Sequence, residues 1–195
     1  TRRLPVSKEI INVQKDLGSK NLGQDLPILL KNQMSVVATS DAGNGVGYTG
    51  FRIRGSAGTS INVMLNGVPY NDSESQGTFF VNIPDMASSA SQIVIQRGVG
   101  TSSNGTASFG ASVNILTKNP DEKPYVLGQF SAGSFNTLKT SFEAGSGKFL
   151  NNLLSVSARY STINSDGYID RAFSKLNSYN INALFEKGNT KIRFL

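Results

Sequence analysis

The sequence contains no cysteine, no histidine and no tryptophan among its 195 residues. The lack of cysteine and histidine removes thiol nucleophiles, imidazole bases and the usual ligands of zinc sites. No pair of carboxylates suggests acid–base catalysis either. The sequence therefore predicts a protein that is not an enzyme, with no catalytic residue, no resident metal and no cofactor. The lack of cysteine does not indicate a compartment, because oxidising compartments permit disulfides without requiring them.

Charge and long apolar runs are also scarce. Charged residues make up 16% of the chain and hydrophobic residues 38%, and both fractions are low for a soluble globular domain. The net charge of +6 is spread along the chain without a basic block, which argues against a nucleic-acid partner. No stretch approaches about 18 consecutive apolar residues, so no membrane-spanning helix is expected. No secretory signal is recognisable either.

The first 120 residues predict short elements separated by turns, because glycine, serine and asparagine are frequent there. A short helix is predicted over residues 21–33, where Asp25 can cap the first turn and Pro27 suits it. A helical turn is expected at residues 86–92. Apolar and β-branched runs predict strands at residues 10–13, 51–55, 60–70, 93–98 and 111–118.

A glycine-rich segment, GVGTSSNGTASFG at residues 98–110, lies between two of these predicted strands. A dinucleotide-binding loop requires a helix after the glycines, and a P-loop requires a lysine directly after them. The sequence offers neither, because ASVNILTK at residues 111–118 alternates like a strand and Lys118 is the first lysine to follow. We therefore interpret the glycines as turn-forming residues and not as a phosphate cradle.

The pattern changes after Pro124, where apolar and polar residues alternate over segments of about ten residues. In LLSVSARYST at residues 153–162, for example, the apolar positions alternate with serine and arginine. Such segments match tilted membrane strands with one apolar and one polar face. A soluble β-sandwich gives similar alternation, so this half of the chain alone leaves both interpretations open.

Three motifs follow one another in the first 120 residues: FRIRG at 51–55, INVMLNGVP at 61–69 and IVIQRGVGTSSNGTASFGASVNILTK at 93–118. In this order they resemble the plug domain of TonB-dependent outer-membrane receptors, which shows an IRG strand, a V-x-V-L-x-D-G-V-P turn and a third, glycine-rich stretch. The family's aspartate before G-V-P is Asn66 here, and its glutamate in the third motif is Val94. The segment SDAGNGVGYTGFRIRG at 40–55 also resembles receptors of Bacteroidetes-type bacteria.

The resemblance implies an α+β plug, a small mixed sheet with short helices, followed by antiparallel strands of a transmembrane β-barrel. We expect the plug over residues 1–120 and the first barrel strands over residues 121–195. About five strands cannot close a barrel, which needs at least eight, so we expect a partial receptor. The segment that contacts TonB would precede Thr1.

The resemblance also implies which residues bind ligand and which hold the plug. Three loops, at residues 41–50, 71–80 and 101–109, are expected to face outward. Aromatic and acidic residues on them are the candidate ligand contacts: Tyr48, Asp72, Glu74, Phe79, Phe80 and Phe109. Arg54 and Arg97 are expected to pair with glutamates of the barrel wall, because the planar guanidinium binds carboxylates in a bidentate manner.

Such a receptor imports a scarce chelate across the outer membrane of a Gram-negative bacterium. A ferric siderophore or another iron complex is the first candidate ligand, followed by cobalamin and by an oligosaccharide or peptide. The implied partners are TonB with ExbB and ExbD, the remaining barrel, outer-membrane lipid and a surface lipoprotein. A soluble all-β binding or adhesion module is the alternative of a different class, and it leaves the three ordered motifs unexplained.

Overall fold

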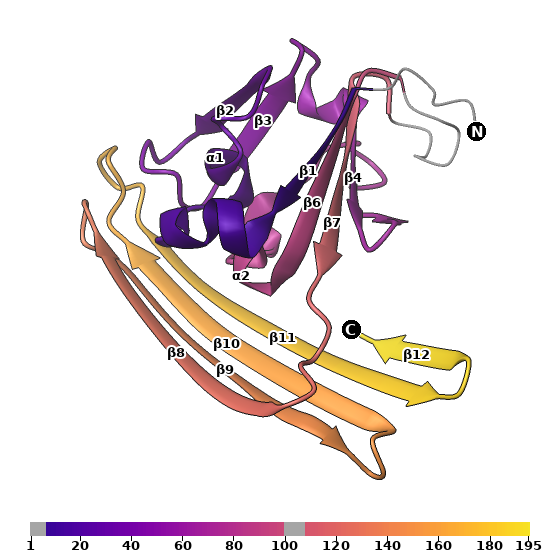
Figure 1. Cartoon of the computed structure of the whole chain (residues 1–195). Coiled ribbons are helices and arrows are strands. Elements are labelled where there is room, and N and C mark those ends of the chain that lie inside the picture. The colour runs from indigo at the N-terminus through magenta and orange to yellow at the C-terminus, as the bar shows by residue number, and fades with distance from the viewer. Residues whose placement is uncertain (1–6, 100–107) are drawn as a thin grey trace. The chain divides into compact units, whose positions relative to one another are not determined.

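The structure is a computed structural model that describes residues 7–99 and 108–195. It divides into two compact units, Thr1–Thr117 and Lys118–Leu195, which are described separately. The first unit combines a mixed sheet with short helices, and the second is a row of antiparallel strands (Figure 1). The predicted fold class is confirmed. Among the described residues, no helix has both the length and the apolar character needed to cross a membrane.

The main sheet of the first unit has five strands in the order β1-β6-β7-β4-β5. The pairing of β4 with β7 is parallel and the other pairings are antiparallel. Figure 1 shows β1, β6, β7 and β4 side by side. The strands span Ser7–Asn12 (β1), Ile61–Leu65 (β4), Val68–Pro69 (β5), Ala90–Arg97 (β6) and Ala111–Thr117 (β7).

A second, two-stranded sheet pairs β2 (Val36–Ser40) with β3 (Thr49–Ile53). The sequence does not predict β2, because its five residues are too few for a clear period. It also places β3 two residues too late. The hairpin loop between these strands is one of the three loops expected to bind ligand.

The helices of the first unit are shorter than predicted. The helix expected over residues 21–33 is reduced to α1 (Leu26–Leu29), and the expected helical turn is α2 (Met86–Ser89). Asp25 occupies the position before α1, yet its side chain caps no amide of that helix. The remaining helical turns span Val13–Leu17 (η1), Gly18–Lys20 (η2), Gly58–Ser60 (η3) and Phe80–Asn82 (η4).

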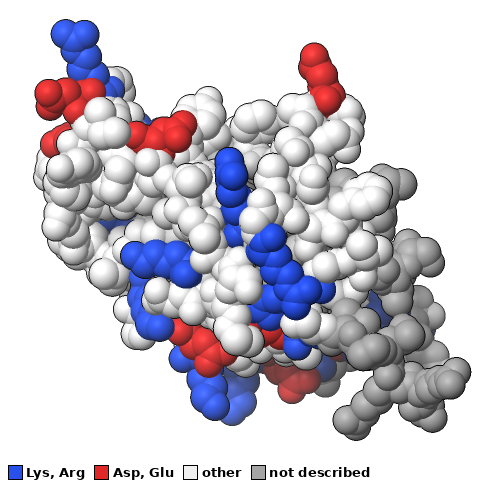
Figure 2. Space-filling model, turned by 90° about the horizontal axis from the view of Figure 1, so that it is seen from above, with Lys and Arg blue, Asp and Glu red and all other residues white. Residues whose placement is uncertain are grey.

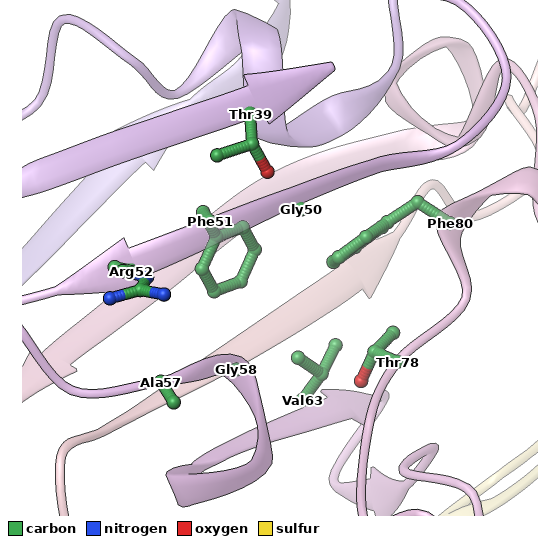
Figure 3. Close-up of a pocket in the computed structure, with 9 residues that line it drawn as sticks. All are labelled: Thr39, Gly50, Phe51, Arg52, Ala57, Gly58, Val63, Thr78 and Phe80. Atoms are coloured by element: carbon green, nitrogen blue, oxygen red, sulfur yellow. The ribbon is translucent and has the colours of Figure 1, made fainter. Parts of the chain in front are cut away.

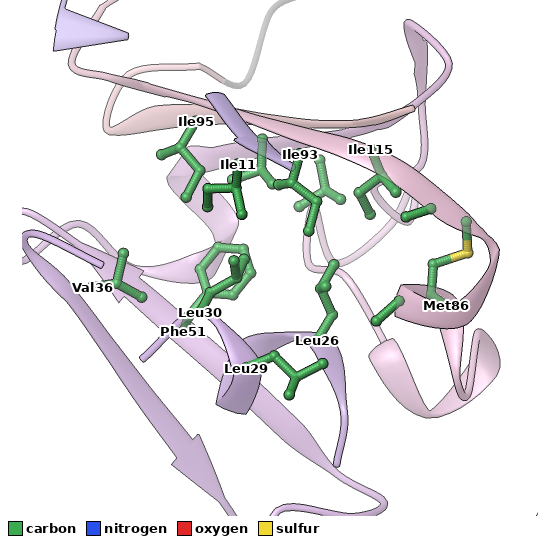
Figure 4. Packing of buried hydrophobic residues seen from close by; sticks show 14 of the residues in the cluster. Ile11, Leu26, Leu29, Leu30, Val36, Phe51, Met86, Ile93, Ile95 and Ile115 are labelled. Carbon is green, nitrogen blue, oxygen red and sulfur yellow. The ribbon is translucent and has the colours of Figure 1, made fainter. Parts of the chain in front are cut away.

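The hydrophobic core lies between one face of the main sheet and the short helices (Figure 4). Ile93 and Ile95 of β6 and Val113 of β7 are fully buried, and they alternate with residues on the other face. Leu26 and Leu30 pack into the same cluster from α1 and its end. Burial of this apolar surface is the main term that stabilises the unit.

Two glycines close the base of the glycine-rich segment. The amide of Gly98, at a φ of 83°, donates to the carbonyl of Gly110 at 2.7 Å, and the amide of Gly110 donates to the carbonyl of Ser60 at 2.9 Å. A Cβ atom at Gly110 would lie 2.2 Å from the Cβ of Ser56, so no side chain fits there. The segment is followed by a strand, as expected, and most of it, residues 100–107, lies outside the described residues.

The second unit is an antiparallel meander in the order β12-β11-β10-β9-β8. Its four long strands have 10 to 14 residues, enough to cross a bilayer core when tilted. The strands span Pro124–Gly133 (β8), Thr137–Phe149 (β9), Leu154–Ser165 (β10), Ser174–Lys187 (β11) and Thr190–Phe194 (β12).

The two faces of this meander differ in polarity. Tyr160 of β10 lies between Phe142 of β9 and Tyr179 of β11, and all three rings are exposed. One residue earlier, Arg159 lies between Glu143 and an asparagine on the opposite face. An apolar face opposite a charged face is the pattern expected for strands that separate lipid from a polar interior.

We expect the substitution Ile93→Ala to lower the free energy of local opening of β6 by about 2–5 kcal/mol, because it leaves a cavity in a fully buried site. Ile10→Ala is the matched control, since Ile10 lies on the neighbouring strand and is largely exposed. Hydrogen exchange of the β6 amides in the purified receptor measures the effect. Equal changes in both variants would show that the core is not where we place it.

Candidate ligand-binding and docking sites

Arg97, at the end of β6, is engaged inside the first unit. Only 5% of this residue is exposed. Its guanidinium forms an ion pair with Glu9 of β1, and its Nε donates to the carbonyl of Met34 at 3.0 Å. Arg97 thus fastens the edge strand β1 and the segment before β2 to the centre of the sheet. Its expected contact with a barrel glutamate stays a prediction.

Arg54, unlike Arg97, has an exposed side chain. It follows β3 at a φ of 52°, an unusual value for a residue other than glycine, and its amide donates to the carbonyl of Ser35 at 3.0 Å. Its Nη1 lies 3.3 Å from the position that a Cβ of Gly98 would take. The side chain is exposed and makes no hydrogen bond or ion pair with residues 7–99 or 108–195. It can therefore reach a carboxylate outside this unit.

In the loop at residues 71–80, Asp72 organises the backbone. Its Oδ1 accepts hydrogen bonds from the amide of Ser75 at 2.7 Å, the hydroxyl of Ser75 at 2.9 Å and the amide of Glu74 at 3.1 Å. These donors hold the pKa of the Asp72 carboxyl below its ordinary value. Glu74 and Phe79 are exposed on the same loop and are available to a ligand.

Phe80, in contrast, belongs to the core. Only 3% of the residue is exposed, and its ring packs against that of Phe51 with the centroids 5.3 Å apart. Sequence reasoning groups it with Phe79 because adjacent residues share a loop. The two side chains lie in different environments, because Phe79 has extended backbone and Phe80 begins the helical turn η4.

The hairpin loop at residues 41–48 exposes Tyr48 and covers a buried carboxyl. Tyr48 is 62% exposed, whereas Asp25 is 2% exposed. The Asp25 Oδ2 accepts from the hydroxyl of Thr49 at 2.9 Å, and its amide donates to the carbonyl of Gly45 at 2.9 Å. Burial raises the pKa of Asp25 to about 6, although hydrogen bonds from Thr49 and the Gly47 amide oppose the shift. Asp25 links α1 to the loop instead of capping the helix.

The predicted site residues fall into two groups. Phe109, which is 74% exposed, precedes Gly110 at the end of the unit that also holds Arg54 and Arg97. Tyr48 lies at the other end of β3 from Arg54. The structure thus places Arg54 and Arg97 at one end of the first unit. Tyr48 lies at the opposite end of β3, away from Arg54 and Phe109.

Sequence reasoning missed two partners in these sites. Glu9 lies 88 residues before Arg97, and Thr49 lies 24 residues after Asp25. No local spacing reports contacts of such sequence separation, because Glu9 meets Arg97 through the pairing of β1 with β6, and Asp25 meets Thr49 where the start of α1 packs against the hairpin of β2 and β3. Among the described residues, no group of three acidic side chains could hold a metal ion. Figure 2 shows basic side chains interspersed with acidic ones on the face in view.

The profile of the TonB-dependent Receptor Plug Domain family matches residues 1–112 of the chain. No curated protein matches the sequence. The chain is also similar to solved structures of receptors and of a transporter, and because the sequence identities are low, this similarity shows the fold alone.

The pyoverdine outer-membrane receptor FpvA from Pseudomonas aeruginosa PAO1, bound to pyoverdine, superposes with a TM-score of 0.76 at 15% identity, over 97% of this chain and 27% of that chain. The ferric yersiniabactin uptake receptor FyuA from Yersinia pestis gives 0.69 at 16%, over 92% and 29%. The copper transporter OprC gives 0.67 at 14%, over 93% and 28%. The chain thus spans about a quarter of the length of the receptors that it matches.

We expect Asp25→Asn to remove a pH dependence from the hairpin loop. The folded-state pKa of Asp25, about 6, exceeds its ordinary value of 3.8, so the folded protein binds more protons between these values. The free energy of loop opening then falls as the pH rises from about 4 to 6, by up to about 3 kcal/mol. In Asp25→Asn this loss is absent, so the variant loop is more stable at pH 8 and unchanged at pH 4.

Protection factors for the amides of Gly47 and Thr49, obtained by hydrogen exchange in the purified receptor, measure this effect. Asp41→Asn is the control, because Asp41 lies on the same loop and is exposed. Identical pH slopes for the Asp25 variant and the parent protein would contradict the prediction.

Proposed function

The chain belongs to the TonB-dependent receptor plug domain family, and from this premise we propose that it is part of a receptor that imports a nutrient across the outer membrane of a Gram-negative bacterium. The observation that carries the proposal is the family match over residues 1–112, followed in the same chain by a meander with one apolar and one charged face. Import of this kind breaks no bond in the ligand.

We propose the plug at residues 1–120 and the first strands of the barrel at residues 121–195. The contrast between the exposed rings of Phe142, Tyr160 and Tyr179 and the polar residues opposite supports the second assignment. In a closed barrel the apolar face would contact lipid and the polar face would line the interior. The remaining strands would come from the rest of the receptor.

We propose a ferric siderophore or another iron complex as the ligand. Two of the similar structures are named as receptors for pyoverdine and for ferric yersiniabactin, which favours this class, while OprC is named as a copper transporter. Cobalamin and an oligosaccharide or peptide are the further candidates. The exposed residues Tyr48, Asp72, Glu74 and Phe79 would contact the ligand, with Phe109 as a contact at the arginine end.

TonB, energised by ExbB and ExbD, is the proposed driving partner, and a surface lipoprotein is a further one. β1 is an edge strand of the main sheet and is held by the Arg97–Glu9 ion pair. A partner that pulls on the chain can therefore detach β1 and leave the pairings between the other strands intact. The Bacteroidetes-type origin is proposed from the SDAGNGVGYTGFRIRG segment.

Uptake of radiolabelled ferric siderophore and of cobalamin, in cells with and without TonB, tests the function. Cells that express the full-length receptor should accumulate one of the two only when TonB is present. Uptake that persists without TonB, or recovery of the receptor in the soluble fraction, would overturn the proposal. Receptor in the outer membrane with no uptake of either compound would exclude both ligands and direct the assay to glycans and peptides.

We expect Arg54→Ala to loosen the docking of the plug, because it removes the open guanidinium at the end of β3. Limited proteolysis of outer membranes should then cleave within residues 1–120 several times faster than in the parent receptor. Lys31→Ala is the control, since Lys31 is another exposed cation of this unit. Equal cleavage rates in the parent and Arg54→Ala would show that Arg54 does not hold the plug.

A further inference from the structure

A cavity of about 240 Å³ opens in the first unit between the two-stranded sheet and β4. Its apolar wall comes from Phe51, Phe80 and Val63, and Figure 3 shows the Phe80 ring edge-on beside the ring of Phe51, which it contacts at a tilt. Thr78 and Phe80, from the loop at residues 71–80, line one side of the cavity, and Thr39 of β2 and Gly50 of β3 line another.

Two polar side chains lining the cavity have unused hydrogen-bonding capacity. The hydroxyl of Thr78 is buried and has no hydrogen-bond partner among residues 7–99 and 108–195. A buried hydroxyl without a hydrogen-bond partner is unfavourable, so an occupant that hydrogen-bonds to it is favoured. The side chain of Arg52 likewise makes no ion pair or hydrogen bond with the described part of the chain. Figure 3 shows Arg52 and Thr78 on opposite sides of the space beside Phe51.

Two glycines, Gly50 and Gly58, line the cavity, and the backbone conformation requires glycine at neither position. Neither Gly50 nor Gly58 has a positive φ. A Cβ at Gly50 would lie 3.4 Å from the Thr39 hydroxyl, and one at Gly58 would lie 3.8 Å from the carbonyl of Phe51. An alanine is therefore sterically acceptable at both positions. Because both residues line the cavity, we expect the added methyl group to reduce its volume.

The volume of the cavity and the chemistry of its lining residues together limit which ligands it can hold. A cavity of roughly 150 Å³ holds benzene, whereas pockets for drug-sized ligands have about 300–1,000 Å³. This cavity thus accepts one substituted ring and excludes a whole siderophore. The aromatic wall favours an aromatic ring, Arg52 favours an anionic group, and Thr78 favours a hydroxyl or a similar polar group at the other end.

We propose that this cavity is a binding site for a free hydroxylated aromatic acid, with its ring against Phe51 and Phe80, its carboxylate at Arg52 and its hydroxyl at Thr78. The site is separate from the contacts with the imported ligand proposed for the exposed residues Tyr48, Asp72, Glu74 and Phe79. It does not depend on import, because binding can be measured on the purified receptor without transport.

Three probes separate the two polar contacts: 4-hydroxybenzoate, benzoate without the hydroxyl, and 4-hydroxybenzamide without the charge. Binding of each to the full-length receptor in detergent is measured by titration calorimetry and by ligand-observed NMR. We expect 4-hydroxybenzoate to bind more tightly than either relative, with one molecule per receptor. Failure of 4-hydroxybenzoate to bind at millimolar concentration would overturn the proposal, whatever the outcome of the uptake assay.

Variants then assign the contacts. Thr78→Val should weaken 4-hydroxybenzoate about 5- to 10-fold and leave benzoate unchanged, because it removes only the hydroxyl contact. Arg52→Gln should weaken benzoate about 10-fold and leave 4-hydroxybenzamide unchanged. A merely structural role of Thr78 would lower the binding of all probes alike. If both variants bound all three probes as the parent does, the cavity would not be the site.

Filling the cavity provides the steric test. Gly58→Ala should weaken all three probes, whereas Gly18→Ala, which adds the same methyl group at a glycine outside the cavity, should leave them unchanged. Resistance of the receptor to protease in both variants shows that the fold is intact. Equal affinities in these two variants would place the bound probe outside this cavity.

Discussion

The close approach of backbone at Gly110 is the constraint on which the first unit depends. At this residue β7 begins, the end of β6 donates a hydrogen bond through Gly98, and the turn before β4 accepts one through Ser60. A Cβ at Gly110 would collide with Ser56, so the three segments meet only if the residue is glycine. The Gly110 amide also ties the start of β7 to the turn before β4, its parallel neighbour in the sheet. Gly98 and Gly110 thus join strand ends through their backbone groups, in keeping with their interpretation as turn-forming residues.

Sequence reasoning found the elements whose periodicity is long and the motifs whose order is specific. It predicted the strands β6 and β7 and the alternating meander after Pro124, because apolar residues at every second position over a long segment are typical of strands. It missed β2 and made the helix at residues 21–33 too long, because five-residue strands and single helical turns are decided by tertiary contacts. The Asp25–Thr49 and Arg97–Glu9 contacts were likewise invisible, since the first requires α1 to pack on the β2–β3 hairpin and the second requires β1 to pair with β6.

The candidate sites show how burial divides residues of the same chemical type. Phe79 and Phe80 are neighbours in sequence, yet one is exposed and the other lies in the core. Arg97 is held inside the unit by Glu9, whereas Arg54 is open. Residue type and motif identified these side chains as candidates, and only the packing shows which of them are exposed and which are held within the unit. In the meander, too, adjacent residues lie in different environments: Arg159 and Tyr160 are on opposite faces of the sheet.

The proposed function requires that the long strands β8–β11 cross the outer membrane with one face in lipid. Residues 1–195 contain no cysteine, so single cysteines can be introduced at successive positions of β11 from Ser178 to Phe185 and spin-labelled, once any cysteine in the rest of the receptor has been replaced by serine. In the full-length receptor in lipid bilayers, labels at Tyr179, Ile181 and Ala183 should be accessible to oxygen, and labels at the alternate positions should not. If the oxygen accessibility of the labels did not alternate with a period of two along β11, this strand would not have one face in lipid. The same would hold if both sets of labels were more accessible to water-soluble reagents than to oxygen.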